Sequence, residues 1–148
     1  MDDKKYTFAD MEKSRLSECA ALFAETCGYP WLTEERALRY FNDMAETPNF
    51  AGFVCLSGGA VEGACLGLIN DYFSAAAYEI KEIFIRPRLQ GRGAGSAFLA
   101  WIEERLQARG VAAVTLFTQR GIPAHGFYLK NGYAESEDTV FFYKNFGL

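Results

Sequence analysis

The sequence has few of the residues that hold metal ions. Its four cysteines form no Cys-x-x-Cys pair, and His125 is the one histidine. A zinc site built from these ligands is therefore not expected, and we predict no metal. The N-terminal segment MDDKKYTF lacks the apolar core of a signal peptide. We interpret the cysteines as small buried hydrophobic residues of a protein in the reducing cytoplasm.

Long apolar runs and an excess of positive charge are also absent. No stretch approaches the roughly 18 apolar residues of a membrane helix. The net charge is −4, which disfavours general binding to nucleic acid or to an anionic membrane but is compatible with a cationic amine. Hydrophobic residues make up 50% and charged residues 23%. This composition predicts one folded domain over residues 1–148, with no linker or repeat.

The strongest local pattern runs from Glu79 to Leu106. It predicts a strand that contains residues 83–85, a glycine-rich turn over residues 90–96, and a helix with one apolar face. A glycine turn that opens a helix leaves backbone N–H groups free at the positive end of the helix dipole. Arg92 adds a positive charge there. The pattern therefore predicts a site for a phosphate-bearing ligand.

Two common nucleotide motifs do not fit this turn. A dinucleotide site needs a third glycine where Ser96 stands, and an acidic residue near Thr115, where the residues are apolar or carry hydroxyl groups. A nucleoside-triphosphate loop needs a Gly-Lys pair, and the sequence contains none.

The segment Gln90-x-x-Gly93-x-Gly95 resembles the Q/R-x-x-G-x-G/A coenzyme A signature of the GNAT family of N-acetyltransferases. The later segment HGFYLKNGY, residues 125–133, is similar to the F-Y-x-K-x-G-F segment near the end of that family. The resemblance implies acetyl-CoA as cosubstrate, with pyrophosphate on the backbone amides of the turn and pantetheine along the preceding strand. That strand would also polarise the thioester carbonyl through a backbone N–H. The cofactor residues expected in this way are Ile83, Phe84, Ile85, Gln90, Gly91, Arg92, Gly93, Ala94, Gly95 and Ser96.

The predicted elements follow the order β-α-α-β-β-β-α-β-α-β-β, which is the order of the GNAT fold. Strands are expected at residues 5–8, 50–56, 60–72, 79–85, 111–118, 133–135 and 140–146, with helices between them. We expect an α/β fold whose mixed, mostly antiparallel central sheet has about six to seven strands and is flanked by about four helices. Ser14 and Thr33 are predicted N-caps, and residues 111–118 are predicted to be buried on both faces. In this family the C-terminal strands often pair between subunits, so residues 140–146 are where a homodimer would form.

Acetyl transfer to an amine needs a neutral amine, a polarised carbonyl and a stabilised thiolate. The resemblance implies that Tyr128 is the general acid, or hydrogen-bond donor, to the coenzyme sulfur; the alternative is simple packing. Gly121 stands where the family commonly has an asparagine that contacts the coenzyme, a contact that Arg120 or the backbone could replace.

Glu82 and Glu79 are the candidate bases. They lie three residues apart and face opposite sides of a regular strand, but the strand carries a bulge in this family, so parity does not decide between them. Burial would raise the pKa of either carboxyl group. The alternative is a carboxylate paired with Lys81 or Arg86. We prefer Glu82 because it directly precedes residues 83–85. His125, one helical turn before Tyr128, could relay a proton or could be a surface residue.

Aromatic residues are the candidates for the acceptor pocket. The resemblance places the loop between the first two helices beside the acceptor, and aromatic faces attract ammonium groups. Tyr29, Trp31 and Tyr72 are therefore predicted to bind substrate, with Phe73 as a further candidate and core packing as the alternative.

The sequence thus predicts an N-acetyltransferase that moves an acetyl group from acetyl-CoA directly to a primary amine of a small molecule or peptide. No covalent relay is expected, because nothing near Cys55 or Cys65 suggests activation of a thiol. The alternative is a non-catalytic acyl-CoA-binding sensor, which the missing asparagine favours and Tyr128 disfavours. A dinucleotide-binding protein is a third interpretation that lacks its acidic residue.

Overall fold

The computed structural model describes residues 6–147. The chain divides into two compact units, residues 1–117 and 118–148, which we treat separately. The single domain predicted over residues 1–148 stays a prediction.

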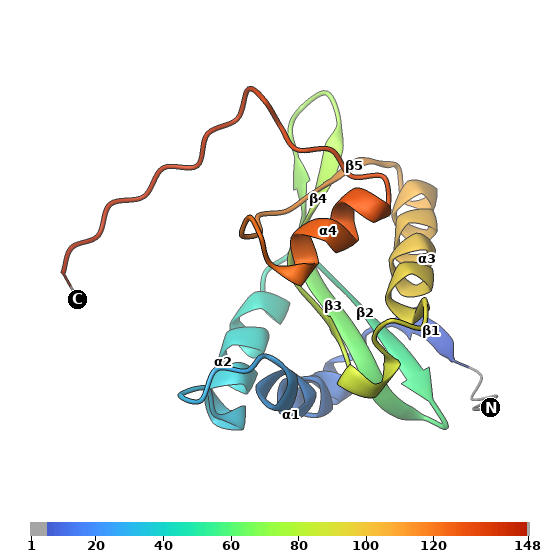
Figure 1. The fold of residues 1–148 in the computed structure, drawn as a ribbon. Helices are drawn as coiled ribbons and strands as arrows, with labels where there is room; N and C mark the ends of the chain where they lie inside the picture. The colour runs from blue at the N-terminus through green and yellow to red at the C-terminus, as the bar shows by residue number, and fades with distance from the viewer. Residues whose placement is uncertain (1–5, 148) are drawn as a thin grey trace. The chain divides into compact units, whose positions relative to one another are not determined.

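The first unit is built on one mixed sheet with the strand order β1-β2-β3-β4-β5 (Figure 1). The strands are β1 (Thr7–Asp10), β2 (Phe50–Ser57), β3 (Ala60–Asp71), β4 (Ala76–Ile85) and β5 (Val111–Thr115). The first three neighbouring pairs are antiparallel, and β5 is parallel to β4. A parallel pair needs a crossover, which is supplied here by the helix between β4 and β5. The predicted α/β class and the mostly antiparallel sheet are confirmed.

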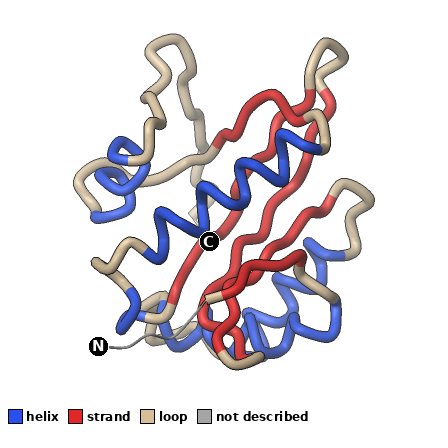
Figure 2. Tube along the Cα trace, turned by 90° about the vertical axis from the view of Figure 1, so that its right-hand side faces the viewer, coloured by secondary structure: helices blue, strands red, loops and turns tan. Residues whose placement is uncertain are grey.

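Helices cover both faces of this sheet (Figure 2). The helices are α1 (Leu16–Thr26), α2 (Glu34–Ala45) and α3 (Ala94–Ala108), with 3-10 turns η1 (Lys13–Arg15) and η2 (Pro87–Leu89). The apolar faces of α1 and α2 pack with Val54, Ala64 and Leu66 in one core. On the α3 side, Phe98 stacks on Phe8 at 5.5 Å between ring centroids, and Trp101 meets Phe53 edge-on at 6.0 Å.

Of the predicted caps, one is confirmed and one is wrong. Thr33 caps α2, because its hydroxyl oxygen accepts a hydrogen bond from the backbone N–H of Arg36 at 3.2 Å. Ser14 does not cap α1, which begins at Leu16 after Arg15. Ser14 lies inside η1, so it lacks the extended backbone that a cap requires.

The strand count is lower than predicted: the described residues hold five strands. Residues 133–135 and 140–146 carry no strand, because no described segment offers them a hydrogen-bonding ladder. Strand β5 ends at Thr115 and, among residues 6–147, pairs with β4 alone. As an edge strand it leaves Ala112, Ala113 and Thr115 exposed, so the predicted burial on both faces is wrong. Strand β1 occupies Thr7–Asp10, and Lys5 of the predicted 5–8 strand lies outside the described residues.

The second unit contains α4 (Pro123–Lys130). Pro123 occupies the first turn, where its missing N–H breaks no helical bond. The helix ends at Asn131 and is followed by Gly132 at φ 88°, the left-handed stop that the Asn-Gly pair predicts.

Candidate active site

A β-bulge in β4 sets the direction of the two candidate bases. Leu66 of β3 pairs with Glu82, and the next residue, Gly67, pairs with Ile80, so Lys81 is the extra residue. Directly opposed residues point to the same face, and Leu66 and Leu68 share a face by alternation. Because Leu68 pairs with Glu79, the bulge places both carboxylates on the face that carries α1 and α2. A regular strand would have separated them.

Glu82 lies beneath α2, where a side chain that the sequence did not single out contacts it. The Tyr40 hydroxyl donates a hydrogen bond to Oε1 of Glu82 at 3.3 Å. Burial raises the pKa of the Glu82 carboxyl group, and the Tyr40 hydrogen bond offsets part of that rise. Burial, followed by the charge of Glu82, raises the pKa of Tyr40 to about 12. Glu82 is thus a partly desolvated carboxylate with a neutral donor, which is a suitable environment for a base.

Glu79 has a different environment, since Lys81 Nζ lies 2.9 Å from its Oε1. The ion pair that was the alternative for both carboxylates therefore exists for Glu79. No such pair with Lys81 or Arg86 is found for Glu82 within residues 6–147.

Strands β4 and β5 pair over only part of the length of β4. The parallel register ends where Glu79 pairs with Thr115, whereas β4 continues to Ile85. On its other side this part of β4 pairs with β3, where Ile83, Phe84 and Ile85 face Cys65, Ala64 and Gly63. Within residues 6–147 no second strand pairs with residues 83–85. Their outer backbone edge has the geometry to hydrogen-bond an extended ligand.

The glycine turn lies directly after β4 and η2. Gly91 and Gly93 have φ of 76° and 81°, a left-handed conformation that glycine adopts without strain. Gly93 is the N-cap of α3, and the N–H groups of Ala94, Gly95 and Ser96 in the first turn have no acceptor within the helix. The space beside both positive-φ glycines is open. The turn therefore fits an anion at the positive end of α3.

The two polar side chains of this turn behave differently. Arg92 is exposed, and its guanidinium forms no ion pair within the described part of the chain. Gln90 donates from Nε2 to the backbone oxygen of Ile85 at 3.4 Å, which ties the turn back to the end of β4.

The candidate acceptor aromatics lie on two loops of the first unit. Tyr29 and Trp31, between α1 and α2, stack with ring centroids 5.1 Å apart and an interplanar angle of 19°. They are 53% and 62% exposed, so they are not core residues. Tyr72 lies in the β3–β4 turn and is exposed, as is Phe73 at φ 71°. Asp71 Oδ1 accepts the Phe73 N–H at 3.0 Å and holds that turn.

Helix α4 carries the candidate acid. Tyr128 is buried and packs against Phe127 and Tyr133, at 5.3 and 5.4 Å between ring centroids. Its predicted role towards a sulfur atom stays a prediction. Gly121 has φ 83°, a conformation that suits glycine at the position of the family asparagine.

His125 pairs with a carboxylate that the sequence did not single out. Its Nε2 contacts Oε1 of Glu135, and Arg120 lies 3.2 Å from the other oxygen of the same carboxyl group. The hydrogen bond with His125, followed by the charge of Arg120, lowers the pKa of Glu135. Within the second unit, His125 is therefore held by a hydrogen-bonding contact with a carboxylate that also pairs with Arg120.

The buried thiols do not favour covalent catalysis. Burial raises the pKa of Cys19 and Cys65 to about 12 and that of Cys55 to about 11, so these thiols stay protonated and weakly nucleophilic. Residues 6–147 contain no group of three His, Cys, Asp or Glu side chains placed to hold a metal ion. No helix in that same range has the length and apolar character needed to cross a bilayer.

Comparison with known proteins identifies the family. The family model for the acetyltransferase (GNAT) family matches residues 16–133, and the chain belongs to this family. Aminoalkylphosphonate N-acetyltransferase of Salmonella typhimurium is 39% identical over 59 residues, which cover 39% of this chain and 38% of that protein. An uncharacterized N-acetyltransferase of Methanocaldococcus jannaschii is 28% identical over 144 residues, which cover 90% of this chain and 63% of that protein. The matched part thus spans less than two thirds of either relative.

Solved structures show the same fold. The aminoglycoside N-acetyltransferase AAC(6')-Iy in complex with CoA has a TM-score of 0.77 at 18% identity, with 95% of each chain covered. A putative acetyl transferase from Pyrococcus furiosus has a TM-score of 0.77 at 23% identity, covering 95% of this chain and 99% of that chain.

Proposed function

We propose that this protein is an acetyl-CoA-dependent N-acetyltransferase that acetylates a primary amine of a small molecule or peptide. The observation that carries the proposal is the free backbone edge of β4, which leads directly into a glycine turn at the start of α3. One continuous segment thereby offers hydrogen bonds to an extended arm and an anion site for its phosphate end.

The cofactor residues follow from this segment. The amides of residues 90–96 bind pyrophosphate, with Arg92 adding charge. Residues 83–85 bind the pantetheine arm along their open edge, and one of their N–H groups polarises the thioester carbonyl. Acetyl-CoA, when bound, supplies the activated acetyl thioester.

Glu82 prepares the nucleophile. An alkylammonium has a pKa of about 10, so most of it must lose a proton before it can attack. The partly desolvated Glu82 carboxylate takes that proton through a water molecule, while Glu79 stays paired with Lys81. The amine nitrogen then bonds to the acetyl carbon, the carbon–sulfur bond breaks, and the nitrogen releases its second proton to solvent, leaving the amide. The sulfur receives a proton from the Tyr128 hydroxyl, a role supported by the family motif.

The acceptor binds at the exposed Tyr29–Trp31 stack, where ring faces attract an ammonium group, with Tyr72 as a further contact. An aminoglycoside and an aminoalkylphosphonate are amines named in the descriptions of similar proteins. Their variety supports a small amine as the acceptor class.

We also propose a cellular location and an oligomeric state for the protein. A cytoplasmic location is supported by four cysteines that are all free thiols. A homodimer formed through residues 140–146 is supported by a run of exposed apolar and aromatic side chains, including Val140, Phe142 and Phe146.

Thermal unfolding with acetyl-CoA, CoA and NADH, each titrated separately, tests the proposal. We expect both CoA species to raise Tm by several degrees, because a ligand that binds only the folded state stabilises it. A rise with NADH alone, or no rise with acetyl-CoA, would contradict it. Tyr128→Phe then separates enzyme from sensor: an enzyme loses turnover while its affinity for CoA is kept.

A further inference from the structure

A second β-bulge lies at the start of β3, away from the candidate bases. Leu56 of β2 pairs with Val61, but Cys55 pairs with Gly63, so Glu62 is the extra residue. A bulge locally breaks the ladder and redirects the inserted residue. Here the backbone oxygen of Glu62 accepts the N–H of Arg86 at 2.8 Å, which joins the bulge to the end of β4.

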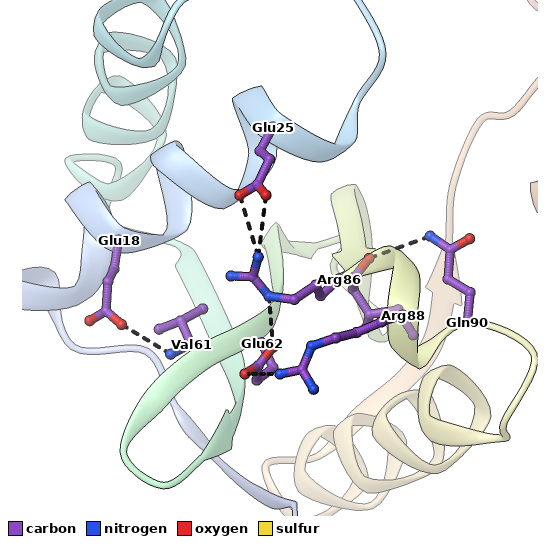
Figure 3. A network of polar contacts seen from close by, with 8 residues as sticks. Glu18, Glu25, Val61, Glu62, Arg86, Arg88 and Gln90 are labelled. Carbon is purple, nitrogen blue, oxygen red and sulfur yellow. Dashed lines mark hydrogen bonds and ion pairs between the residues drawn. The ribbon is translucent and has the colours of Figure 1, made fainter.

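The Glu62 side chain is a buried carboxylate held by two arginines (Figure 3). Arg86 donates from Nε to Oε2 at 2.8 Å, and Arg88 donates from a terminal guanidinium nitrogen to Oε1 at 2.7 Å. The carboxylate is only 8% exposed. Hydrogen bonds between ionised groups in a desolvated position are short and directional, so both oxygens have a fixed partner.

The two arginines flank Pro87 and lead directly into the glycine turn. Arg86 is the N-cap of η2, and Arg88 lies inside it, one residue before the buried Leu89. Figure 3 shows both guanidinium groups directed at Glu62, whereas Gln90 points to the other side of the chain. We call the Glu62 carboxylate with its two arginines, Arg86 and Arg88, the clamp. The clamp fixes the backbone that leads into residues 90–93, without placing its own charges in the turn.

The contact of Arg86 with Glu25 is much weaker. Both of its distances are 3.4 Å, and Glu25 is 64% exposed. Solvent screens such an ion pair, so Glu25 contributes little to fixing the position of Arg86. Of the two carboxylates that contact Arg86, Glu62 is therefore the one that fixes its position.

We propose that Glu62 is a positioning residue for the coenzyme's pyrophosphate: it clamps Arg86 and Arg88 so that the glycine turn is preformed for the anion. This inference rests on the proposed function, because it assigns the role of the turn to pyrophosphate. A preformed turn binds more tightly because its ordering cost is met before the ligand arrives. Loss of the clamp should therefore weaken binding of the phosphate-bearing part of acetyl-CoA and leave binding of its thioester end unchanged.

The test compares Glu62→Gln and Arg88→Gln with Glu25→Gln. The last variant makes the same side-chain change in the same network, at the exposed carboxylate. Each is assayed for kcat/KM with acetyl-CoA and with S-acetylpantetheine, which has the thioester arm but no pyrophosphate. For Glu62→Gln and Arg88→Gln we expect kcat/KM for acetyl-CoA to fall by about 10- to 100-fold, as for a misplaced binding group. The value for S-acetylpantetheine should stay within about twofold of wild type, and Glu25→Gln should match wild type on both donors.

A second readout keeps the test decisive if Glu62→Gln folds poorly. In Arg88→Gln, the Glu62–Arg86 pair remains, and amide hydrogen exchange should accelerate in residues 88–93 but not in β3. Equal losses on both donors, or unchanged exchange in the turn, would overturn the positioning role while the acetyltransferase assignment stands. A wild-type chain that binds no CoA and transfers no acetyl group would overturn both proposals, which is a separate outcome.

Discussion

The Tyr40 hydroxyl on α2 donates a hydrogen bond to the carboxylate of Glu82 on β4, at 3.3 Å. This contact joins helix α2 to strand β4 at the bulge, and it gives Glu82 a neutral hydrogen-bond donor. Burial and this hydrogen bond act on the Glu82 pKa in opposite directions, so removing the donor has a predictable sign.

Tyr40→Phe should shift the pH profile of acetyl transfer. The hydrogen bond lowers the Glu82 pKa, so its loss raises that pKa further. The acid limb of log kcat/KM, where the base becomes protonated, should move to higher pH. Tyr6→Phe, outside the site, is the control. An acid limb that stays in place in Tyr40→Phe would remove Glu82 as the titrating base.

Glu82→Gln should lose activity without losing stability. Loss of a positioned base costs about 10²- to 10⁴-fold in rate. Burial raises the folded-state pKa above the unfolded value, so the folded state binds the proton more tightly. Protonated Glu82 therefore contributes fully to the free energy of unfolding at pH values below its unfolded-state pKa. This contribution is lost as pH rises through the folded-state pKa. At neutral pH the charged carboxylate is thus unfavourable, and the Tm of Glu82→Gln should equal or exceed that of wild type.

Glu79→Gln is the matched control for that substitution, since both carboxylates lie on the same face of β4. Its ion pair with Lys81 is partly exposed, so we expect a change in Tm of only a few degrees and retained kcat. Loss of kcat in Glu79→Gln with activity kept in Glu82→Gln would exchange the two roles.

Trp31→Ala should weaken binding of the acceptor amine and leave binding of acetyl-CoA unchanged. The exposed stack with Tyr29 offers a cation–π contact of about 1 kcal/mol, so the acceptor KM should rise about fivefold. The KM for acetyl-CoA should not change. Steady-state kinetics with each substrate varied in turn measures both, and Tyr72→Ala tests the second loop in the same assay.

Gly93→Ala should disturb the turn by backbone strain. A residue with a Cβ pays about 1–2 kcal/mol in the left-handed region, and Gly93 has φ 81°. We expect a lower Tm and weaker CoA binding by calorimetry. Gly126→Ala is the contrasting variant: this residue lies within α4, does not have a positive φ and has open space at Cβ, so its Tm should stay the same or rise.

Phe142→Asp should reduce self-association. Phe142 is 86% exposed within residues 140–146, and a charge there opposes strand pairing between copies. Light scattering at several protein concentrations should give a lower mean mass than for wild type. An unchanged mass would argue against this segment as the dimer interface.

Local patterns predicted the parts of the site that depend on local chemistry. The spacing of Gly91 and Gly93 before an amphipathic helix predicted the turn, and Thr33 predicted a cap, because backbone conformation and capping act over a few residues. The family resemblance singled out Tyr29 and Trp31 as acceptor candidates, a role that stays a prediction, whereas the stacking of the two rings on each other was not foreseen.

The family resemblance led us to expect a bulge in β4, and the pairing shows one, but the sequence did not determine which residues of distant segments lie opposite one another. The extra residues Lys81 and Glu62 become bulges only through the register with neighbouring strands, and Tyr40 reaches Glu82 across 42 positions of sequence. The same limit explains residues 140–146, whose apolar character suggested a strand. A strand exists only when another segment completes its ladder.

The free outer edge of β4 has a consequence for handling the protein. Unpaired backbone groups beside apolar side chains attract other strands and promote aggregation. In the absence of coenzyme, residues 83–85 present such an edge, and the proposed pantetheine arm would cover it. Bound acetyl-CoA should therefore reduce aggregation in addition to serving as a substrate. Protein kept saturated with acetyl-CoA should remain monodisperse for longer than protein from which the coenzyme has been removed.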